Sequence, residues 1–283
     1  MNVDGIKIPR FLYGTAWKEG QTTYLTGLAL EQGFRGVDTA NQRKHYNEKG
    51  VGKAIQESAA AQLVARSDLF LQTKFTFRHG QDNRLPYDPQ APIPDQVKQS
   101  FMSSLEHLKT DIIDSYILHG PSHRVGLSSD DWEAWGAMEE LYLSGQTRLI
   151  GVSNVSLEQI ESLCKEARFQ PRFVQNRCYA TQGWDKQIRQ FCAANRIVYQ
   201  GFSLLTANQA VMAHNELTQI ASRHRKTVSQ VIFQFAINIG IIVLTGTTNT
   251  NHMREDLAAL EFRLKPNEVK IIEKLASTIR FAN

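Results

Sequence analysis

Four residues of the chain are of types that can carry out acid–base chemistry together: Asp38, Tyr46, Lys74 and His119. A tyrosine hydroxyl has an unperturbed pKa of about 10, which is high for a proton donor at neutral pH. A nearby lysine ammonium lowers that pKa, and a buried lysine needs a partner such as Asp38. A histidine beside the phenol could hydrogen-bond a carbonyl oxygen. Such a set would protonate a carbonyl oxygen, and a cofactor would have to supply hydride because no side chain donates it.

Each of these residues also has an alternative interpretation. Asp38 could cap a turn, Tyr46 could be a packed aromatic residue, and His119 could be a hydrogen-bonded core histidine. Lys74 could instead be a Schiff-base nucleophile. The four residues alone leave these alternatives open, so the elements that carry them have to be considered.

Strand-like segments alternate with helix-like segments along the chain. The expected strands are residues 11–17, 35–40, 69–75, 114–120, 148–154, 172–179, 197–204 and 241–247. The expected helices are residues 22–32, 47–58, 94–108, 130–144, 156–167, 183–195, 215–224, 227–239, 251–257 and 266–276. This alternation implies parallel strands joined by crossovers, and eight units without a linker predict one (β/α)8 TIM barrel domain over residues 1–283. A doubly wound open sheet is the alternative, but its G-x-G-x-x-G turn is absent.

Polar residues stand at the ends of six consecutive expected strands. They are Asp38, Lys74, His119, Ser153 with Asn154, Gln175, and Ser203. In a barrel these strand ends converge on the face that holds the active site. The long loops after Phe75 and His119 leave the same face, so they are candidate walls of a substrate site; the alternative is that they are surface loops.

The composition excludes several classes of function. The net charge of +4 comes from scattered Lys and Arg, which argues against a nucleic-acid-binding protein. The N-terminus lacks a signal-peptide pattern, and no apolar run is long enough to span a bilayer. The three cysteines have no CxxC spacing and the eight histidines no zinc-binding spacing. We therefore expect a cytoplasmic monomer with reduced thiols, no metal and a small-molecule substrate.

Several motifs resemble the aldo-keto reductase family. GVDTA…HYNE…VG is similar to the family's D-T-A…Y…N-E…V-G segment, in a variant with the longer D-T-A-N-Q-R-K-H-Y form. LFLQTKF resembles its lysine strand, and DIIDSYILHGP resembles its histidine strand. GQTRLIGVSN, residues 145–154, matches G-x-x-R-x-I-G-V-S-N at every fixed position. The resemblance covers nearly the whole chain.

The resemblance implies a role for each site residue. Tyr46 would be the general acid, Lys74 and Asp38 would tune it, and His119 would orient the carbonyl. NADP(H) would bind without a Rossmann unit: Ser153, Asn154 and Gln175 at the carboxamide, Phe202 under the nicotinamide ring, and Ser203 and Leu205 along the pyrophosphate. Trp17 would border the substrate. The other implied cofactor-binding residues are Thr15, Gly246, Thr247, Thr248, Asn249, His252, Glu255 and Asp256.

Three departures from the family pattern change these expectations. Tyr46 lies eight positions after Asp38, where many members have five, and His45 falls three before Glu48, so His45 is the alternative acid. The chain reads VLTGTTNTNHMREDL at 243–257, where many members have I-P-K-S…R…E-N. Losing that Lys and Arg removes charge-assisted bonds of roughly 1.5–3 kcal/mol each, which predicts a weakened NADPH preference and use of NADH. Gly120 replaces a common Trp and the chain stops at Asn283, which predicts an open pocket for bulky carbonyls.

These observations predict an NAD(P)H-dependent reductase of aldehydes and ketones, with alcohol oxidation as the reverse reaction. One alternative is a redox-sensing regulatory subunit that binds the cofactor but turns over little. Another is a Schiff-base lyase that uses Lys74, although it would leave the GVSN segment unexplained.

Overall fold

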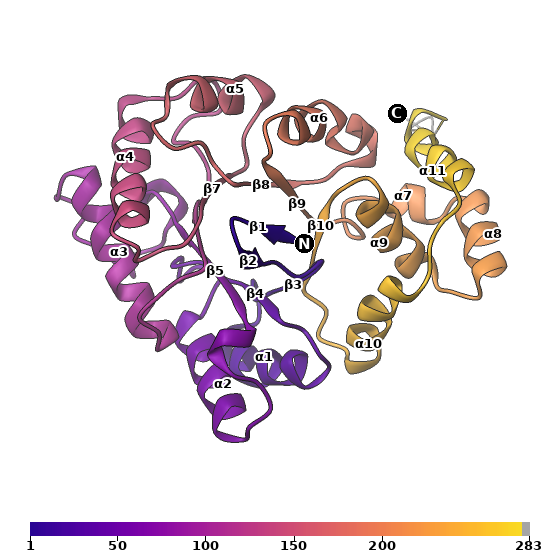
Figure 1. The fold of residues 1–283 in the computed structure, drawn as a ribbon, viewed down its shortest axis with the longest axis horizontal. Coiled ribbons are helices and arrows are strands. Elements are labelled where there is room, and N and C mark those ends of the chain that lie inside the picture. The colour runs from indigo at the N-terminus through magenta and orange to yellow at the C-terminus, as the bar shows by residue number, and fades with distance from the viewer. Residues whose placement is uncertain (279–283) are drawn as a thin grey trace.

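In the computed structural model, which describes residues 1–278, strands β3 to β10 form a closed parallel barrel (Figure 1). Each strand pairs with the next one along the chain, and β10 pairs with β3 to close the barrel. The strands are β3 (Phe11–Gly14), β4 (Gly36–Asp38), β5 (Phe70–Phe75), β6 (Ser115–Leu118), β7 (Ile150–Ser153), β8 (Phe173–Arg177), β9 (Val198–Phe202) and β10 (Ile242–Thr245). The predicted (β/α)8 barrel is confirmed.

The helices surround this barrel (Figure 1). They are α1 (Thr22–Glu31), α2 (Glu48–Ala60), α3 (Ile93–Leu108), α4 (Ser129–Leu143), α5 (Leu157–Glu166), α6 (Lys186–Ala194), α7 (Gln209–Met212), α8 (Asn215–His224), α9 (Val228–Asn238), α10 (Thr250–Ala258) and α11 (Pro266–Thr278). The short α7 and the antiparallel pair of β1 (Asn2–Val3) and β2 (Ile6–Lys7) were not expected from the sequence. This pair lies over the centre of the barrel in Figure 1.

Alternation along β5 shows how the barrel separates its apolar and polar layers. Phe70 belongs to a small apolar cluster inside the barrel, whereas Leu71 and Phe75 belong to the cluster that packs against the helices. Gln72 and Lys74 point into the barrel, as Phe70 does, because side chains alternate between the two faces of a strand. Both are fully buried. The interior is therefore apolar at one end and polar toward the carboxyl ends of the strands.

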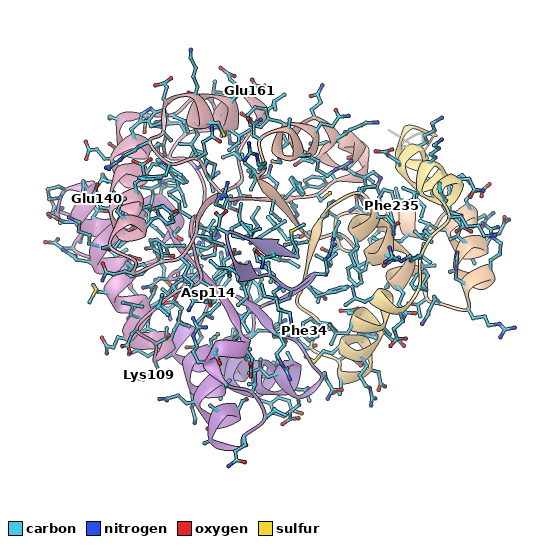
Figure 2. The ribbon with its side chains drawn as sticks, in the orientation of Figure 1. Phe34, Lys109, Asp114, Glu140, Glu161 and Phe235 are labelled. Atoms are coloured by element: carbon cyan, nitrogen blue, oxygen red, sulfur yellow. The ribbon has the colours of Figure 1, made fainter. Side chains whose placement is uncertain are left out.

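The main apolar core lies between the barrel and its helices. Phe34, before β4, and Phe235, on α9, are both buried there. Figure 2 shows that Glu140 and Glu161 lie on the outer faces of α4 and α5, whereas Phe34 and Phe235 lie inside the ring of helices. This two-layer burial holds the strands rigidly, so their ends can position reactive side chains.

The loop after β5 packs onto the segment that carries Tyr46. The Gln42 side-chain amide donates to the Gly80 carbonyl at 2.6 Å. Arg84 Nη2 donates to the backbone carbonyl of Arg43 at 2.7 Å. The loop is thus tied to residues 42–43, and its role as a wall of a substrate site stays a prediction.

Candidate active site

Lys74 and Asp38 form a buried ion pair at the polar end of the barrel. Lys74 Nζ lies 2.7 Å from each carboxylate oxygen of Asp38 and also donates to the Thr39 carbonyl at 2.8 Å. Lys74 is 0% exposed. Burial lowers the pKa of Lys74, and the charge and hydrogen bonds of Asp38 oppose that change. The pairing expected from the sequence therefore brings strands β4 and β5 together at their ends.

Tyr46 lies directly before the first turn of α2 and faces this pair. The Asn47 side chain accepts a hydrogen bond from the Gly50 N–H at 3.0 Å, which caps α2 and sets where the helix begins. Lys74 Nζ lies 5.5 Å from the centroid of the Tyr46 ring. Burial, followed by the negative charge of Asp38, raises the pKa of Tyr46 well above its ordinary value. This direction is opposite to the expected lowering, because burial disfavours the charged phenolate and the negative charge of Asp38 acts in the same direction.

His119 lies beside Tyr46 at the end of β6. The two ring centroids are 5.9 Å apart in an edge-on arrangement. The His119 Nδ1 is 2.7 Å from the Thr76 hydroxyl oxygen. Burial, with the charge of Lys74 as a second cause, lowers the pKa of His119 to about 3. The imidazole is therefore neutral at physiological pH and can donate a hydrogen bond from one ring nitrogen only.

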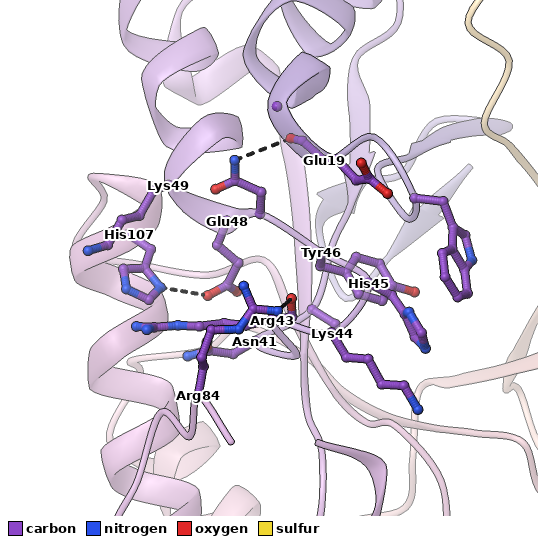
Figure 3. Close-up of a pocket in the computed structure, with 14 residues that line it drawn as sticks. Glu19, Asn41, Arg43, Lys44, His45, Tyr46, Glu48, Lys49, Arg84 and His107 are labelled. Carbon is purple, nitrogen blue, oxygen red and sulfur yellow. Dashed lines mark hydrogen bonds and ion pairs between the residues drawn. The ribbon is translucent and has the colours of Figure 1, made fainter. Parts of the chain in front are cut away.

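His45, the alternative acid, occupies a different position from Tyr46. Its ring stacks on Trp17 with centroids 3.7 Å apart, and the Trp17 side chain is 68% exposed. Tyr46 lines the cavity of Asp38 and His119 as well as a smaller neighbouring cavity of about 570 Å³, whereas His45 lines only the smaller one. Figure 3 shows this smaller cavity along the segment that holds both residues. The geometry favours Tyr46 over His45 as the group next to the buried ion pair.

Glu48, which sequence reasoning used only as a spacing reference, anchors this segment. Its buried carboxylate accepts hydrogen bonds from the hydroxyls of Thr73 on β5 and Ser104 on α3. It also lies 3.1 Å from His107 Nδ1, a contact drawn in Figure 3. These contacts fix the first turn of α2 against β5 and α3, and so fix Tyr46 two residues earlier.

A cavity of about 850 Å³ lies at the carboxyl ends of the strands and contains most of the predicted site. The predicted residues that line it are Trp17, Asp38, Tyr46, His119, Ser153, Asn154, Gln175, Phe202, Ser203, Leu205, Gly246, Thr247, His252, Glu255 and Asp256. Lining residues that the sequence analysis did not single out include Lys18, Arg177, Thr206, Thr227 and Ser229. Four predicted residues are not in the lining: Lys74, Thr15, Thr248 and Asn249.

Besides Lys74, whose contacts are described above, two of these residues make hydrogen bonds outside the cavity lining. Thr15 is fully buried, and its hydroxyl donates to the backbone carbonyl of Asp38 at 3.1 Å. This bond helps to fix the backbone of the residue that pairs with Lys74. Asn249 caps α10, where its side-chain oxygen accepts from the N–H groups of Asn251 and His252 at 2.8 and 3.2 Å. The structure therefore gives both side chains a local role that the resemblance did not suggest.

Gln175 belongs to a buried network of amides around Asp38. Its Nε2 donates to Asp38 Oδ1 at 3.0 Å and to Gln200 Oε1 at 2.9 Å. Gln72 Nε2 donates to the same two oxygens, at 2.7 and 2.8 Å. Because its Nε2 faces this network, Gln175 can offer its Oε1 as an acceptor to a ligand in the cavity. Isolated strand patterns do not reveal such a network, since it joins β4, β5, β8 and β9.

Ser153 and Asn154 meet His119 at the ends of β6 and β7. The Ser153 hydroxyl donates to the Gln175 carbonyl at 2.6 Å, and Asn154 Nδ2 donates to the His119 carbonyl at 2.7 Å. Asn154 and Ser203 adopt left-handed backbone conformations, with φ of 55° and 57°. Non-glycine residues are held in this region when the surrounding structure determines their conformation, which often happens at functional sites.

The far end of the cavity is lined by the segment after β10. Asp256 accepts a hydrogen bond from the Thr245 hydroxyl at 2.7 Å. Burial raises the pKa of Asp256 to about 6. Gly246 stands where the sequence analysis expected many family members to have a lysine. Its backbone carbonyl accepts a hydrogen bond from Lys18 Nζ. This end is therefore built from neutral donors, one lysine and two carboxyl groups.

Residues 21–277 match the profile of the aldo/keto reductase family. The chain belongs to this family. It is 30% identical to glyoxal reductase of Bacillus subtilis over 276 residues, which cover 96% of this chain and 90% of the relative. It is 28% identical to prostaglandin F synthase 1 of Bos taurus over 309 residues, which cover 98% of this chain and 91% of the relative. The resemblance inferred from the motifs is thus confirmed, and membership makes the protein an oxidoreductase.

Solved structures of aldo/keto reductases share the same fold. The enzyme from Brucella melitensis is 30% identical with a TM-score of 0.80, and the match covers 96% of each chain. The enzyme from Bombyx mori, solved in complex with NADP, is 26% identical with a TM-score of 0.81, and the match covers 96% of this chain and 90% of that one.

Two kinds of feature are absent from residues 1–278. None of their helices combines the length and apolar character needed to cross a membrane. Nor do these residues contain a group of three or more His, Cys, Asp or Glu side chains placed to hold a metal ion.

Proposed function

We propose that this aldo/keto reductase reduces aldehydes and ketones to alcohols, with NADPH as cofactor and Tyr46 as the proton donor. The observation that carries the proposal is the shared cavity of Tyr46 and His119 above the Lys74–Asp38 pair. His45 lines a different cavity and stacks on Trp17, which supports Tyr46 as the acid. The NADP complex of the Bombyx mori relative supports the cofactor.

The residues at the bottom of the cavity suit a nicotinamide dinucleotide, which would supply the hydride when bound. The orientation of Gln175 presents an acceptor oxygen, which matches the N–H groups of a carboxamide. Ser153 and Asn154 line the same region, and the Phe202 ring would pack against a flat heterocycle. The volume of about 850 Å³ is in the range of cofactor-sized pockets.

The proton chemistry follows from the two side chains beside the carbonyl site. With its pKa raised by burial, Tyr46 stays protonated at neutral pH and holds the proton that a carbonyl oxygen needs. His119 is neutral, so it can donate from Nε2 only if the Thr76 hydroxyl donates to Nδ1. Both groups then direct donors at one oxygen, and Lys74 stabilises the phenolate left after transfer.

The cofactor preference should be weaker than is usual in the family. The segment 243–257 lacks the lysine and arginine that many members carry, and the carboxyl groups of Glu255 and Asp256 line the cavity there. We expect NADH to bind and support turnover. A preference for NADPH of several orders of magnitude would contradict this expectation.

A fluorescence titration with NADPH and NADH, followed by turnover of 4-nitrobenzaldehyde, tests the function. Quenching with turnover supports the reductase, and quenching without turnover would favour a redox-sensing regulatory subunit. If neither cofactor binds, hydride chemistry is excluded, and borohydride trapping would test Lys74 as a Schiff-base nucleophile.

The assignment of the acid is tested by paired variants. Tyr46→Phe should lower kcat by at least about 100-fold, the usual scale for a general acid, while cofactor affinity stays within about twofold. His45→Phe keeps an aromatic ring on Trp17 and should retain most of the activity. Wild-type turnover in Tyr46→Phe, with loss in His45→Phe, would move the acid role to His45.

A further inference from the structure

The smaller cavity, of about 570 Å³, carries an excess of positive charge (Figure 3). Its lining includes the cationic side chains of Arg43, Lys44, Lys49 and Arg84 and the carboxylates of Glu19 and Glu48. The cavity lies along the segment that precedes α2 and reaches the loop after β5, which carries Arg84. Nothing in the proposed reaction so far accounts for this charge.

Arg43 is the half-buried cation of this cavity, and it has no partner. Among the described side chains, its guanidinium forms neither an ion pair nor a hydrogen bond. Arg84, by contrast, pairs with Asp82 at 2.5 Å, and its Nη2 donates to the backbone carbonyl of Arg43 at 2.7 Å. Lys44 and Lys49 are exposed, so water solvates their charges. The planar fork of donors on Arg43 is therefore the group that lacks an acceptor.

The two carboxylates of the cavity do not neutralise this guanidinium. Glu48 is buried, and its carboxylate accepts hydrogen bonds from the hydroxyls of Thr73 and Ser104. Glu19 is exposed and forms no ion pair with any described side chain. A concave surface lined by an excess of one sign of charge attracts a ligand of the opposite sign. The smaller cavity is therefore suited to an anionic group.

The position of the cavity indicates which molecule would bring that group. Trp17 and Tyr46 line both cavities, so the two spaces meet beside the proposed acid. A molecule whose carbonyl oxygen lies at Tyr46 can therefore place another of its groups in the smaller cavity. A guanidinium binds a carboxylate through two parallel hydrogen bonds, and one unpaired cation matches a single negative charge.

We propose that the smaller cavity is a substrate subsite in which Arg43 binds the carboxylate of an acidic aldehyde or ketone. The inference rests on the proposed function and names a substrate class for it, carbonyl compounds that carry a carboxylate. The hydrogen bond from Arg84 holds the backbone of Arg43 in place. Binding a group remote from the reacting carbonyl strengthens ground state and transition state alike, so the subsite lowers KM.

The test compares kcat/KM for 4-carboxybenzaldehyde and 4-nitrobenzaldehyde, which have similar shapes but differ in charge. In Arg43→Gln the ratio of the first value to the second should fall roughly tenfold, through a higher KM for 4-carboxybenzaldehyde. This is the lower end of the scale for a hydrogen bond to a charged group, because Arg43 is only half-buried. Arg168→Gln is the matched control: it removes the same charge from a side chain that is 63% exposed and lines neither cavity.

The possible outcomes separate this inference from the proposed function. A ratio that is the same in Arg43→Gln and the wild type, or that falls equally in Arg168→Gln, overturns the subsite, while turnover of 4-nitrobenzaldehyde preserves the reductase function. A wild type that turns over neither aldehyde overturns both. If Arg43→Gln does not fold, the wild type decides: added salt should lower the ratio because it screens the attraction between charges. A ratio independent of salt would then reject the subsite.

Discussion

Replacing Lys74 by Met separates the electrostatic role of this residue from its role in folding. Asp38 loses two contacts of 2.7 Å to the ammonium but keeps amide donors from Gln72 and Gln175, at 2.7 and 3.0 Å. Removing one partner of a buried ion pair typically costs about 3–5 kcal/mol, and the remaining donors place this case near the lower end. Domains of this kind are stable by about 5–15 kcal/mol, so the variant should still fold at 25 °C.

Urea unfolding and turnover together measure the two effects. We expect Lys74→Met to lower the free energy of unfolding by about 3 kcal/mol and to abolish turnover while cofactor binding persists. The double variant Lys74→Met with Asp38→Asn removes both charges. Its loss in free energy of unfolding should be smaller than the sum of the losses in the two single variants, because neither charge is left buried without its partner.

Two results would refute the reasoning on this ion pair. One is additive destabilisation in the double variant, which would mean that the two residues do not interact strongly. The other is near-normal turnover in Lys74→Met, which would show that the ammonium is not needed to stabilise the tyrosinate.

Three further predictions concern groups around the cavity. Thr76→Val removes the hydroxyl at His119 Nδ1, so kcat should fall by about tenfold or more with little change in cofactor affinity; unchanged kcat would reject the proposed tautomer. Burial raises the pKa of Asp256 from its ordinary value of about 3.8 to about 6, so the native state binds the extra proton and stability should fall as pH rises from about 4 to 6. Asp256→Asn should flatten that decline in urea titrations and be more stable than the wild type by up to about 3 kcal/mol at pH 8, and an unchanged pH profile would contradict this. Gly120→Trp should raise KM for bulky aromatic aldehydes more than for small aldehydes in a substrate panel, whereas equal effects would contradict an open pocket at this position.

Much of the fold is predictable because its signals are local. The strand and helix segments follow from periodicity and from the polar residues at strand ends, which a parallel barrel brings to one face. The expected strands extend beyond the observed ones, as at residues 15–17, because the left-handed backbone of Trp17 ends the extended conformation there. The hairpin of β1 and β2 was missed because two-residue strands carry too little pattern.

The pairing of Lys74 with Asp38, and the position of His119, could be predicted from the order of strands alone. Neighbouring strands in a parallel barrel are neighbours in sequence, so their terminal residues meet. The choice between His45 and Tyr46 could not be made in this way, because adjacent residues on an irregular segment point in directions that only packing determines.

The sequence by itself determined the barrel, the family and the residue types at the strand ends, because these depend on short-range patterns and motifs. Only the tertiary structure revealed the contact between Lys18 and Gly246, which are 228 positions apart, and the amide network of Gln72, Gln175 and Gln200 around Asp38. Closure of the barrel brings its first and last strands together, and its interior brings side chains from opposite strands within hydrogen-bond distance. Burial then raises the pKa of Tyr46 and lowers that of His119, and no local pattern in the sequence encodes that environment.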